Sequence, residues 1–438
     1  MNALLLLFLV YVLLRSVSNG VDRVYDVGFS PALSVGAIVI GLAAGWHMRH
    51  VRVHGKIFTL LVFLSAFVVF TCGLSFVVNL GSGKIIDQYA AWYAILKYVH
   101  LIMFAILVSS VYRHPDFCSS VHRLYTALLL LIASVGLGQY LTGNTVLVTQ
   151  YDPYERAVGL SSHPVPFSLE LVLTFFVCEL SRRKMRLPIG HLHIVVYALF
   201  LVALVLSASR TGVALLGVSV GVYLLVQRPL LLPAFASAFA LLIWISPFGE
   251  LFSGLSSVPD YVMRGEYVVW DWRTAVTSFH WRIHHWYYLS MLASERPWIG
   301  FGPGQVTSYS PFELTAHSQF VELFFETGIV GLMSFAVFWF SIPLTAMSDR
   351  RKLVASNGRG SEQVGILNLW IAMFAGVTLV ALFDQSFNRE TVAFSHLFVS
   401  MFVVLAQPRA AAEVEFGSRY VPMPAGSRIG ELGRRGAG

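Results

Sequence analysis

Twelve long hydrophobic runs divide this chain, and most of them approach the length of a membrane-spanning helix. A helix needs about 20 mostly apolar residues to cross the hydrocarbon core of a bilayer. The sequence therefore predicts an all-α, polytopic membrane protein with about twelve transmembrane helices. We place the spans near residues 2–15, 29–47, 57–79, 89–112, 124–142, 165–181, 190–208, 211–227, 229–247, 317–345, 366–384 and 391–407.

The composition supports this class and excludes a soluble protein of the same size. Hydrophobic residues make up 56% of the 438 residues and charged residues only 12%, with a mean hydropathy of +0.70. The net charge of +7 is expected to face anionic lipid, so no nucleic-acid partner is predicted. Cys72, Cys118 and Cys178 are isolated. Neither a metal nor another cofactor is expected.

The distribution of Lys and Arg between the runs predicts the orientation in the membrane. Placing both termini in the cytoplasm puts nineteen of these residues inside and ten outside. Arg15 directly follows the first run, and no basic residue precedes that run. Such a pattern allows either a cleaved signal peptide or a retained first helix. The missing basic leader and the missing small-x-small cleavage site favour retention.

One long loop stands out among short connections. Residues 248–316 form a predicted outer loop that holds five of the ten tryptophans. These aromatic side chains suit either an interfacial belt at the lipid headgroups or stacking against sugar rings. Residues 274–294 predict a helix lying against the membrane that ends before Pro297. Residues 1–407 are expected to form a single membrane domain, followed by a disordered cytoplasmic tail at 408–438.

Three residues in or near this loop carry candidate chemistry. Arg210 turns the chain between two hydrophobic runs. It suits either a surface arginine whose side chain reaches the lipid headgroups or a clamp for phosphate oxygens. Arg282 lies one helical turn before Trp286. His317 begins the tenth run and is the local side chain that exchanges a proton near neutral pH, although an interfacial histidine is more often a polar anchor.

A glycine-rich segment and one carboxylate complete the set of candidates. Gly300, Gly302 and Gly304 alternate after Trp298. They predict a backbone that can approach a ligand closely and whose unpaired amides would bind an anion or a sugar. Glu326 is interpreted either as an organiser of the helix top or as the partner of an arginine.

These motifs, in this order, resemble the O-antigen ligase superfamily, which includes lipopolysaccharide O-antigen ligases and Wzy-type polysaccharide polymerases. The resemblance covers about residues 150–345. It rests on the segments Arg156–Leu160, His163-Pro164, Ser209–Gly212, Arg282–Trp286, Pro297–Gly302, His317 and Phe325–Gly331. Two positions depart from the family pattern. Ser318 stands where many relatives have Asn, and His163-Pro164-Val165 replaces a commoner Pro-Asn.

The resemblance implies a membrane glycosyltransferase of the bacterial inner membrane. Such an enzyme moves a glycan from an undecaprenyl (polyprenyl) pyrophosphate carrier to an acceptor hydroxyl on the outer face, in polysaccharide polymerisation or ligation. The expected partners are the carrier-linked oligosaccharide, a glycan or glycolipid acceptor, the bilayer and other polysaccharide-assembly proteins. His317, Arg282 and Arg210 are the predicted catalytic residues. The residues predicted to bind substrate are Arg156, His163, Gly302, Glu326 and Trp286.

The chemistry expected of these residues requires no metal. Arginines would neutralise the pyrophosphate leaving group, and His317 would accept the proton of the acceptor hydroxyl. A transporter or flippase for polyprenyl-linked sugars is the rival interpretation, because it also needs cations for pyrophosphate. A transporter would place its polar residues at mid-bilayer depth. This chain instead concentrates them in one loop, which favours the enzyme.

Overall fold

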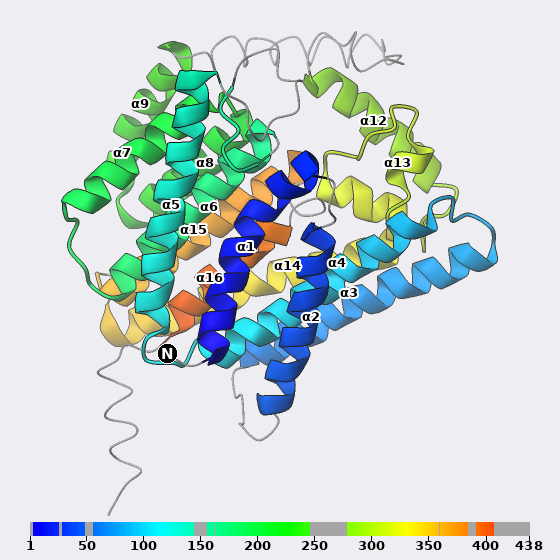
Figure 1. Ribbon diagram of the computed structural model, residues 1–438, viewed down its shortest axis with the longest axis horizontal. Helices are drawn as coiled ribbons and strands as arrows, with labels where there is room; N and C mark the ends of the chain where they lie inside the picture. The colour runs from blue at the N-terminus through cyan, green and yellow to red at the C-terminus, as the bar shows by residue number, and fades with distance from the viewer. Residues whose placement is uncertain are drawn as a thin grey trace, which may run out of the picture.

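The computed structural model describes residues 3–25, 29–48, 56–143, 156–161, 163–245, 278–358, 360–383 and 391–406. Within these ranges every regular element is a helix, and the helices pack as a bundle (Figure 1). The all-α prediction is therefore confirmed. The predicted tail at 408–438 and residues 248–277 of the predicted loop lie outside the described residues.

Each predicted hydrophobic run corresponds to one helix. Of the helices in the described ranges, seven are long and apolar enough to cross a membrane, and five shorter ones are also apolar. The bundle helices are α1 (Ala3–Tyr25), α2 (Phe29–Met48), α3 (Lys56–Gly81), α4 (Gln88–Val111), α5 (Phe117–Thr142), α6 (Pro164–Lys184), α7 (His191–Leu206), α8 (Arg210–Gln227), α9 (Leu232–Ile245), α14 (Gln319–Asn357), α15 (Glu362–Phe383) and α16 (Thr391–Leu405).

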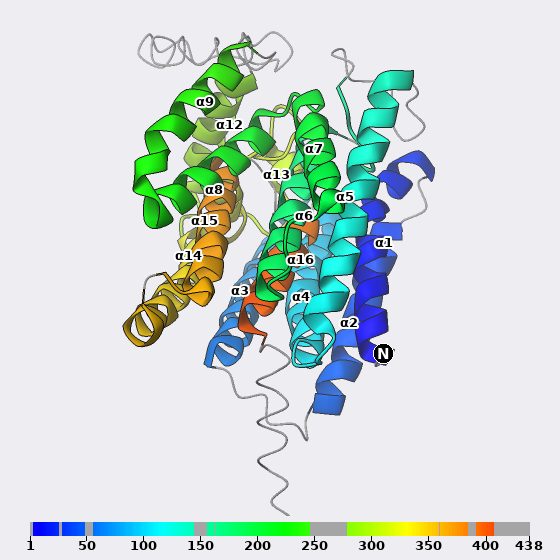
Figure 2. The same cartoon turned by 90° about the vertical axis from the view of Figure 1, so that its left-hand side faces the viewer.

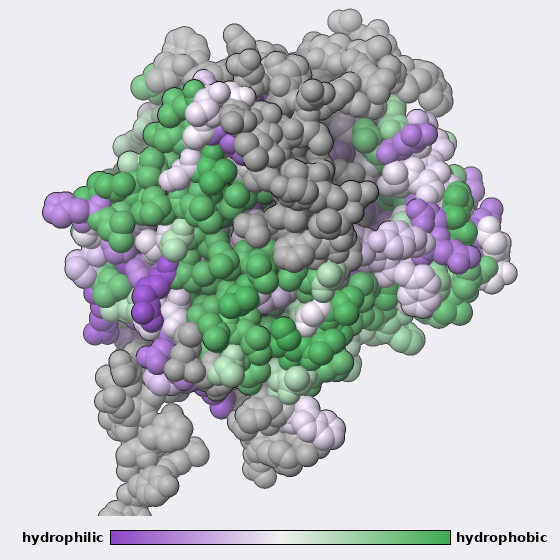
Figure 3. Space-filling view, viewed as in Figure 1, coloured by the Kyte–Doolittle hydropathy of each residue, from purple (hydrophilic) through white to green (hydrophobic). Residues whose placement is uncertain are grey.

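The surface of the bundle is apolar, as a bilayer requires. Hydrophobic residues cover the middle of the face over α1, α2 and α5, whereas hydrophilic residues gather toward its edges (Figure 3). Large side chains such as Trp46, Phe63 and Phe70 are more than 60% exposed. The centre is occupied by α6, which is largely buried. The protein is a polytopic membrane protein, and its exposed apolar side chains have lipid as their natural solvent.

Two further helices lie at one end of the bundle. The helix predicted before Pro297 is present as α12 (Ser278–Ala293), and α13 (Val306–Tyr309) follows it. Both lie beside the first turns of α14 (Figure 1). α14 is interrupted at Gly328, whose φ of 64° and ψ of −167° are not helical. The break separates a short segment that belongs to the site from the long membrane helix below it.

The pairing of α8 with α15 relates two distant parts of the sequence. Their backbones approach closely where Gly376 faces Leu215 and Ser219. Farther along, Asn368 Nδ2 donates a hydrogen bond of 2.6 Å to Gln227 Oε1. The two helices are therefore antiparallel, because higher numbers on one match lower numbers on the other. Extending this register to their ends places the first residue of α8, Arg210, opposite the last residue of α15, Phe383.

Candidate functional site

α12 brings four of its side chains against the segment that leads into α14. Trp281 and His285 are four residues apart, as are Arg282 and Trp286, so the two pairs occupy neighbouring stripes of the helix. Trp286 Nε1 donates a hydrogen bond of 2.5 Å to the carbonyl of Ala316. This bond ties the helix to the residue that directly precedes His317.

His317 packs edge-on against Trp281, with ring centroids 5.1 Å apart and an interplanar angle of 86°. Its φ of 49° lies in the left-handed region, which costs a non-glycine residue about 1–2 kcal/mol. Ser318 begins the helix behind it, because its Oγ accepts a hydrogen bond from the Val321 amide. The anchored Ala316 and this cap hold the imidazole in a strained backbone position, a common property of functional residues.

The guanidinium of Arg282 lies over the same tryptophan. Its carbon is 5.7 Å from the Trp281 ring centroid, and Nη1 donates a hydrogen bond of 3.1 Å to the Phe383 carbonyl. Among the ion pairs of the described residues, none joins Arg282 to a carboxylate. Trp281 thus contacts both Arg282 and His317.

Arg210 lies at the same end of the bundle. The α8–α15 register places it opposite Phe383, the residue whose carbonyl accepts from Arg282. Ser209 caps α8, since its Oγ accepts from the Gly212 amide. Ser209 also accepts a hydrogen bond of 2.7 Å from Ser168 of α6. The three predicted catalytic residues thus gather around the end of α15, although together they span more than one hundred positions of the chain.

Arg156 and His163 lie on the segment that precedes α6. The amide of Ala157 donates to the Leu206 carbonyl over 3.0 Å, so Arg156 lies beside the turn that carries Arg210. The imidazole of His163 caps α6 by accepting the Val165 amide at 3.2 Å. A substrate-binding role for either residue stays a prediction.

The glycine-rich segment contacts the protein itself. The amides of Gly300, Phe301 and Gly302 donate to the carbonyls of Arg296, Phe325 and Glu326, at 2.8–2.9 Å. The expectation of unpaired amides is therefore wrong for Gly300 and Gly302. A Cβ on Gly300 would lie 2.4 Å from the Phe325 carbonyl oxygen. Glycine is required there because two backbones meet at the α14 break. A substrate contact of Gly302 remains a prediction.

The glycine-rich segment and the break in α14 form a junction. Two polar residues of α3 hold this junction together, and sequence reasoning missed both. Ser75 Oγ donates to the carbonyls of Ile299 and Glu326, at 2.6 and 2.8 Å. Asn79 donates to the Gly300 carbonyl at 3.1 Å and accepts from Arg296 at 2.7 Å. They lie inside a hydrophobic run more than two hundred residues away, and no local motif marks them.

Glu326 lies beneath the junction and is only 2% exposed. Its carboxyl group interacts with the backbone amides of Gly304, Gln305 and Val306 and with the charge of Lys97. No arginine forms an ion pair with it among the described residues. The geometry favours the role of organising the helix top, and substrate binding by Glu326 stays a prediction.

His285 is a further residue of the site that the sequence did not single out. Its ring is fully buried and contacts Trp281 and Phe312, at centroid distances of 6.2 and 5.3 Å. Neither ring nitrogen has a hydrogen-bond partner among the residues that the structure describes. Burial, together with the nearby His317, lowers the pKa of His285 to about 3. The site thus contains a neutral imidazole behind the candidate base, and only the helical spacing from Trp281 hints at it.

The described residues contain no cluster of three or more His, Cys, Asp or Glu side chains arranged to hold a metal ion. Among the described residues, this end of the bundle presents two arginines, a histidine and several aromatic rings. Such a group can bind an anion and accept a proton.

Comparison with known families supports the resemblance. Residues 195–336 match the O-antigen ligase family. This chain carries an O-antigen ligase family region. The match includes α8, α12, α13 and the first half of α14, so it covers Arg210, Arg282 and His317. No curated protein matches the sequence. This match supports a membrane enzyme of the O-antigen ligase or polymerase type.

Proposed function

We propose that this protein transfers a glycan from an undecaprenyl pyrophosphate carrier to an acceptor hydroxyl at the outer face of the bacterial inner membrane. The observation that carries the proposal is the contact of both Arg282 and His317 with Trp281. A guanidinium group and a proton acceptor then stand side by side. Glycan transfer from a pyrophosphate needs both groups in one place.

The residues divide the reaction between them. The acceptor oxygen attacks the anomeric carbon, and the bond from that carbon to the pyrophosphate oxygen breaks. The bonding electrons leave with the pyrophosphate, where Arg282, Arg210 and Arg156 offset the developing negative charge. His317 accepts the proton of the hydroxyl. Attack opposite the leaving group inverts the anomeric centre, and no metal takes part.

The orientation of the protein in the membrane is part of the same proposal. Both termini lie in the cytoplasm, and α12 faces the outside, because lysines and arginines concentrate on the other side of the bundle. The acceptor is either a second carrier-linked glycan, which makes the enzyme a polymerase, or a surface glycolipid, which makes it a ligase. Both reactions use the same pyrophosphate clamp and the same base.

A reconstituted assay tests the proposal. Purified protein in liposomes receives a synthetic undecaprenyl pyrophosphate-linked oligosaccharide and both kinds of acceptor, with EDTA present. We expect release of the carrier and formation of a larger glycan, and product size separates a polymer from a single transfer. If the labelled lipid crosses the bilayer without release of the carrier, the protein is a flippase and the proposal fails.

A further inference from the structure

A second site lies at the opposite end of α8 and α15. There α8 ends at Gln227, α15 begins at Glu362, and the two ends border a cavity of about 390 Å³. α8 has 18 residues, and a helix rises 1.5 Å per residue, so this cavity lies about 25 Å from Arg210. Figure 2 shows α12 near the top of the bundle and the turn from α14 into α15 near the bottom. The side chains that line the cavity include those of Arg182, Arg183, Arg186, Tyr223, Gln227 and Glu362.

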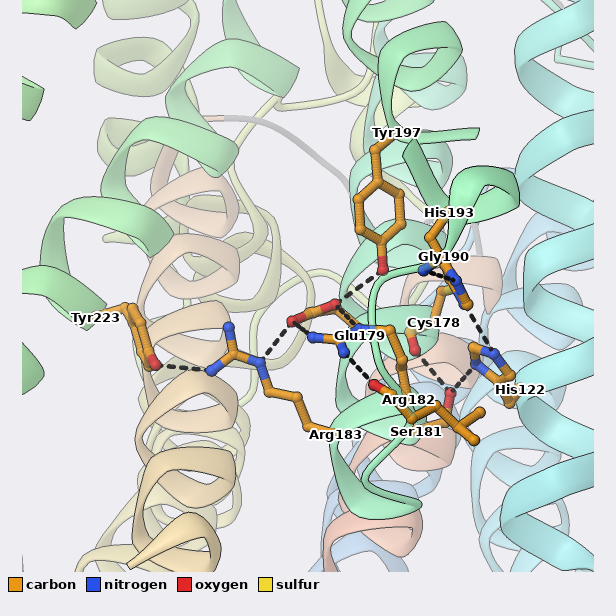
Figure 4. Close-up of polar contacts among 11 residues, drawn as sticks. His122, Cys178, Glu179, Ser181, Arg182, Arg183, Gly190, His193, Tyr197 and Tyr223 are labelled. Atoms are coloured by element: carbon orange, nitrogen blue, oxygen red, sulfur yellow. Dashed lines mark hydrogen bonds and ion pairs between the residues drawn. The ribbon is translucent and has the colours of Figure 1, made fainter. Parts of the chain in front are cut away.

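The two arginines at the end of α6 are fixed in position before any ligand binds (Figure 4). Arg182 makes two hydrogen bonds of 2.8 Å to the carboxylate of Glu179. Arg183 donates to the same carboxylate at 2.5 Å and to the hydroxyl of Tyr223 at 2.7 Å. Tyr197 also donates to Glu179, at 2.8 Å. Guanidinium groups held in this way lose little further freedom when they bind an anion.

The charges around the cavity do not cancel. Glu179 is a single carboxylate shared by two guanidinium groups. The third arginine, Arg186, pairs with Glu362 at 2.8 Å. Three positive groups therefore face two negative ones. The start of α15 adds to this excess, because the N-terminus of a helix carries a partial positive charge.

The backbone at the start of α15 also suits an anion. Ser361 caps the helix, since its Oγ and carbonyl oxygen accept from the amides of Val364 and Gly365, at 3.4 and 3.1 Å. Ser361, Glu362 and Gly365 all line the cavity. The helix start thus opens into the same space as the three arginines. Arginine forks and helix N-termini are both common ligands of phosphate oxygens.

We propose that this cavity binds a phosphate group, and that it is a site separate from the one around His317. The ligand is an anion whose phosphate contacts Arg183, Arg186 and the start of α15. Its chemistry is shared by the headgroup of an anionic phospholipid and by soluble inorganic phosphate. The proposal rests on the excess charge, the fixed guanidinium groups and the cavity, and it is independent of the transferase function.

Binding by the full-length protein tests the proposal. Native mass spectrometry counts the phosphatidylglycerol retained after purification in phosphatidylcholine nanodiscs to which phosphatidylglycerol has been added. Calorimetry measures the binding of inorganic phosphate, the second possible ligand. We expect at least one of the two to bind, and Arg186→Gln to weaken that binding about tenfold, the effect of losing one charge-assisted hydrogen bond. Arg183→Lys keeps the charge but loses the planar pair of N–H donors of the guanidinium group, and it should weaken binding as well.

Lys352→Gln is the matched control. Lys352 is 76% exposed and pairs with Asp349, much as Arg186 is 77% exposed and pairs with Glu362. Lys352 does not line this cavity, so its removal should leave binding unchanged. Binding of phosphatidylglycerol alone identifies a lipid site, and binding of inorganic phosphate alone identifies a soluble ligand. The proposal is overturned if neither binds better than phosphatidylcholine, or if Lys352→Gln weakens binding as much as Arg186→Gln.

Discussion

The two ends of the α8–α15 pair both gather arginines, but they hold them in different ways. At one end Arg282 lies over an aromatic ring and donates to a backbone carbonyl. At the other end Arg182 and Arg183 share the carboxylate of Glu179. No carboxylate of the described residues pairs with Arg282, whereas Arg182 and Arg183 are partly neutralised by the carboxylate that they share.

This difference matches two kinds of anion. A leaving group develops its charge only as the bond breaks, so the protein must supply positive charge that no carboxylate already satisfies. A ligand that stays bound carries its charge throughout, and a partly neutralised pair of arginines holds it without a large desolvation cost. The comparison predicts that substitutions at the first end change turnover and that substitutions at the second change stability or binding.

The largest effect is expected from His317. His317→Ala removes the proton acceptor, and turnover in the reconstituted assay should fall by about a hundredfold to ten-thousandfold. The retained amount of carrier-linked glycan should stay close to wild type, because the arginines remain. Equal turnover in variant and wild type would remove His317 from the mechanism.

Arg282→Gln should lower turnover by about a hundredfold to a thousandfold, the usual cost of losing one group that stabilises the transition state. The matched change at the other end is Arg186→Gln, an exposed ion-pair arginine that lines the cavity at the far end of α8, about 25 Å from Arg210. It should leave turnover within about twofold, as expected for an exposed pair. A similar loss in both variants would contradict the division between the two ends.

The fold and the candidate site differ in how much of each could be predicted from the sequence. The twelve apolar runs, Arg210, Arg282 and His317 could be found because length, hydropathy and motif order are local properties. The shared contact of Arg282 and His317 with Trp281 could not be found, because it depends on how α12 docks on the start of α14. The register of α8 on α15, which brings Arg210 to the same end, depends on a close approach at Gly376.

The glycine-rich segment shows why the remaining details failed. Alternating glycines indicate that a backbone must approach something closely. The pattern does not say whether the neighbour is a ligand or another part of the chain. Here the neighbour is the break in α14, held by Ser75 and Asn79 from a helix far away in sequence.

At the other end, Glu179→Ala should cost stability. The change leaves Arg182 and Arg183 without their carboxylate, and breaking a buried pair in this way costs about 3–5 kcal/mol. Asp349→Ala breaks the exposed pair with Lys352 and should cost less than about 1 kcal/mol. Thermal unfolding of the detergent-solubilised protein measures both. Equal losses would show that burial does not distinguish the two pairs.

Gly328→Ala should disturb the junction more than a glycine substitution in open space does. Gly328 and Gly358 both have positive φ, at 64° and 78°, with ψ near ±180°, so alanine strains either backbone by about 1–3 kcal/mol. A Cβ at Gly328 would also lie 2.3 Å from the Trp298 carbonyl carbon, whereas nothing lies within 4 Å at Gly358. Gly328→Ala should therefore lower the free energy of unfolding by about 1–3 kcal/mol more than Gly358→Ala does, which is the cost of overpacking. A smaller difference would mean that the junction relaxes easily.

The smallest effect is a pH dependence that comes from His285. An unfolded histidine binds a proton below about pH 6.5, whereas burial beside His317 keeps the folded imidazole neutral until its pKa of about 3. Between these values the unfolded chain binds more protons. The contribution of His285 to stability is therefore complete above about pH 6.5, and it falls by up to about 1.4 kcal/mol for each unit of pH below that. His285→Phe should flatten this slope in thermal unfolding between pH 7.5 and 5, while His191→Phe, which replaces an exposed imidazole, should keep it. If His285→Phe keeps the wild-type slope, His285 is already hydrated, and the site around Trp281 is open to water.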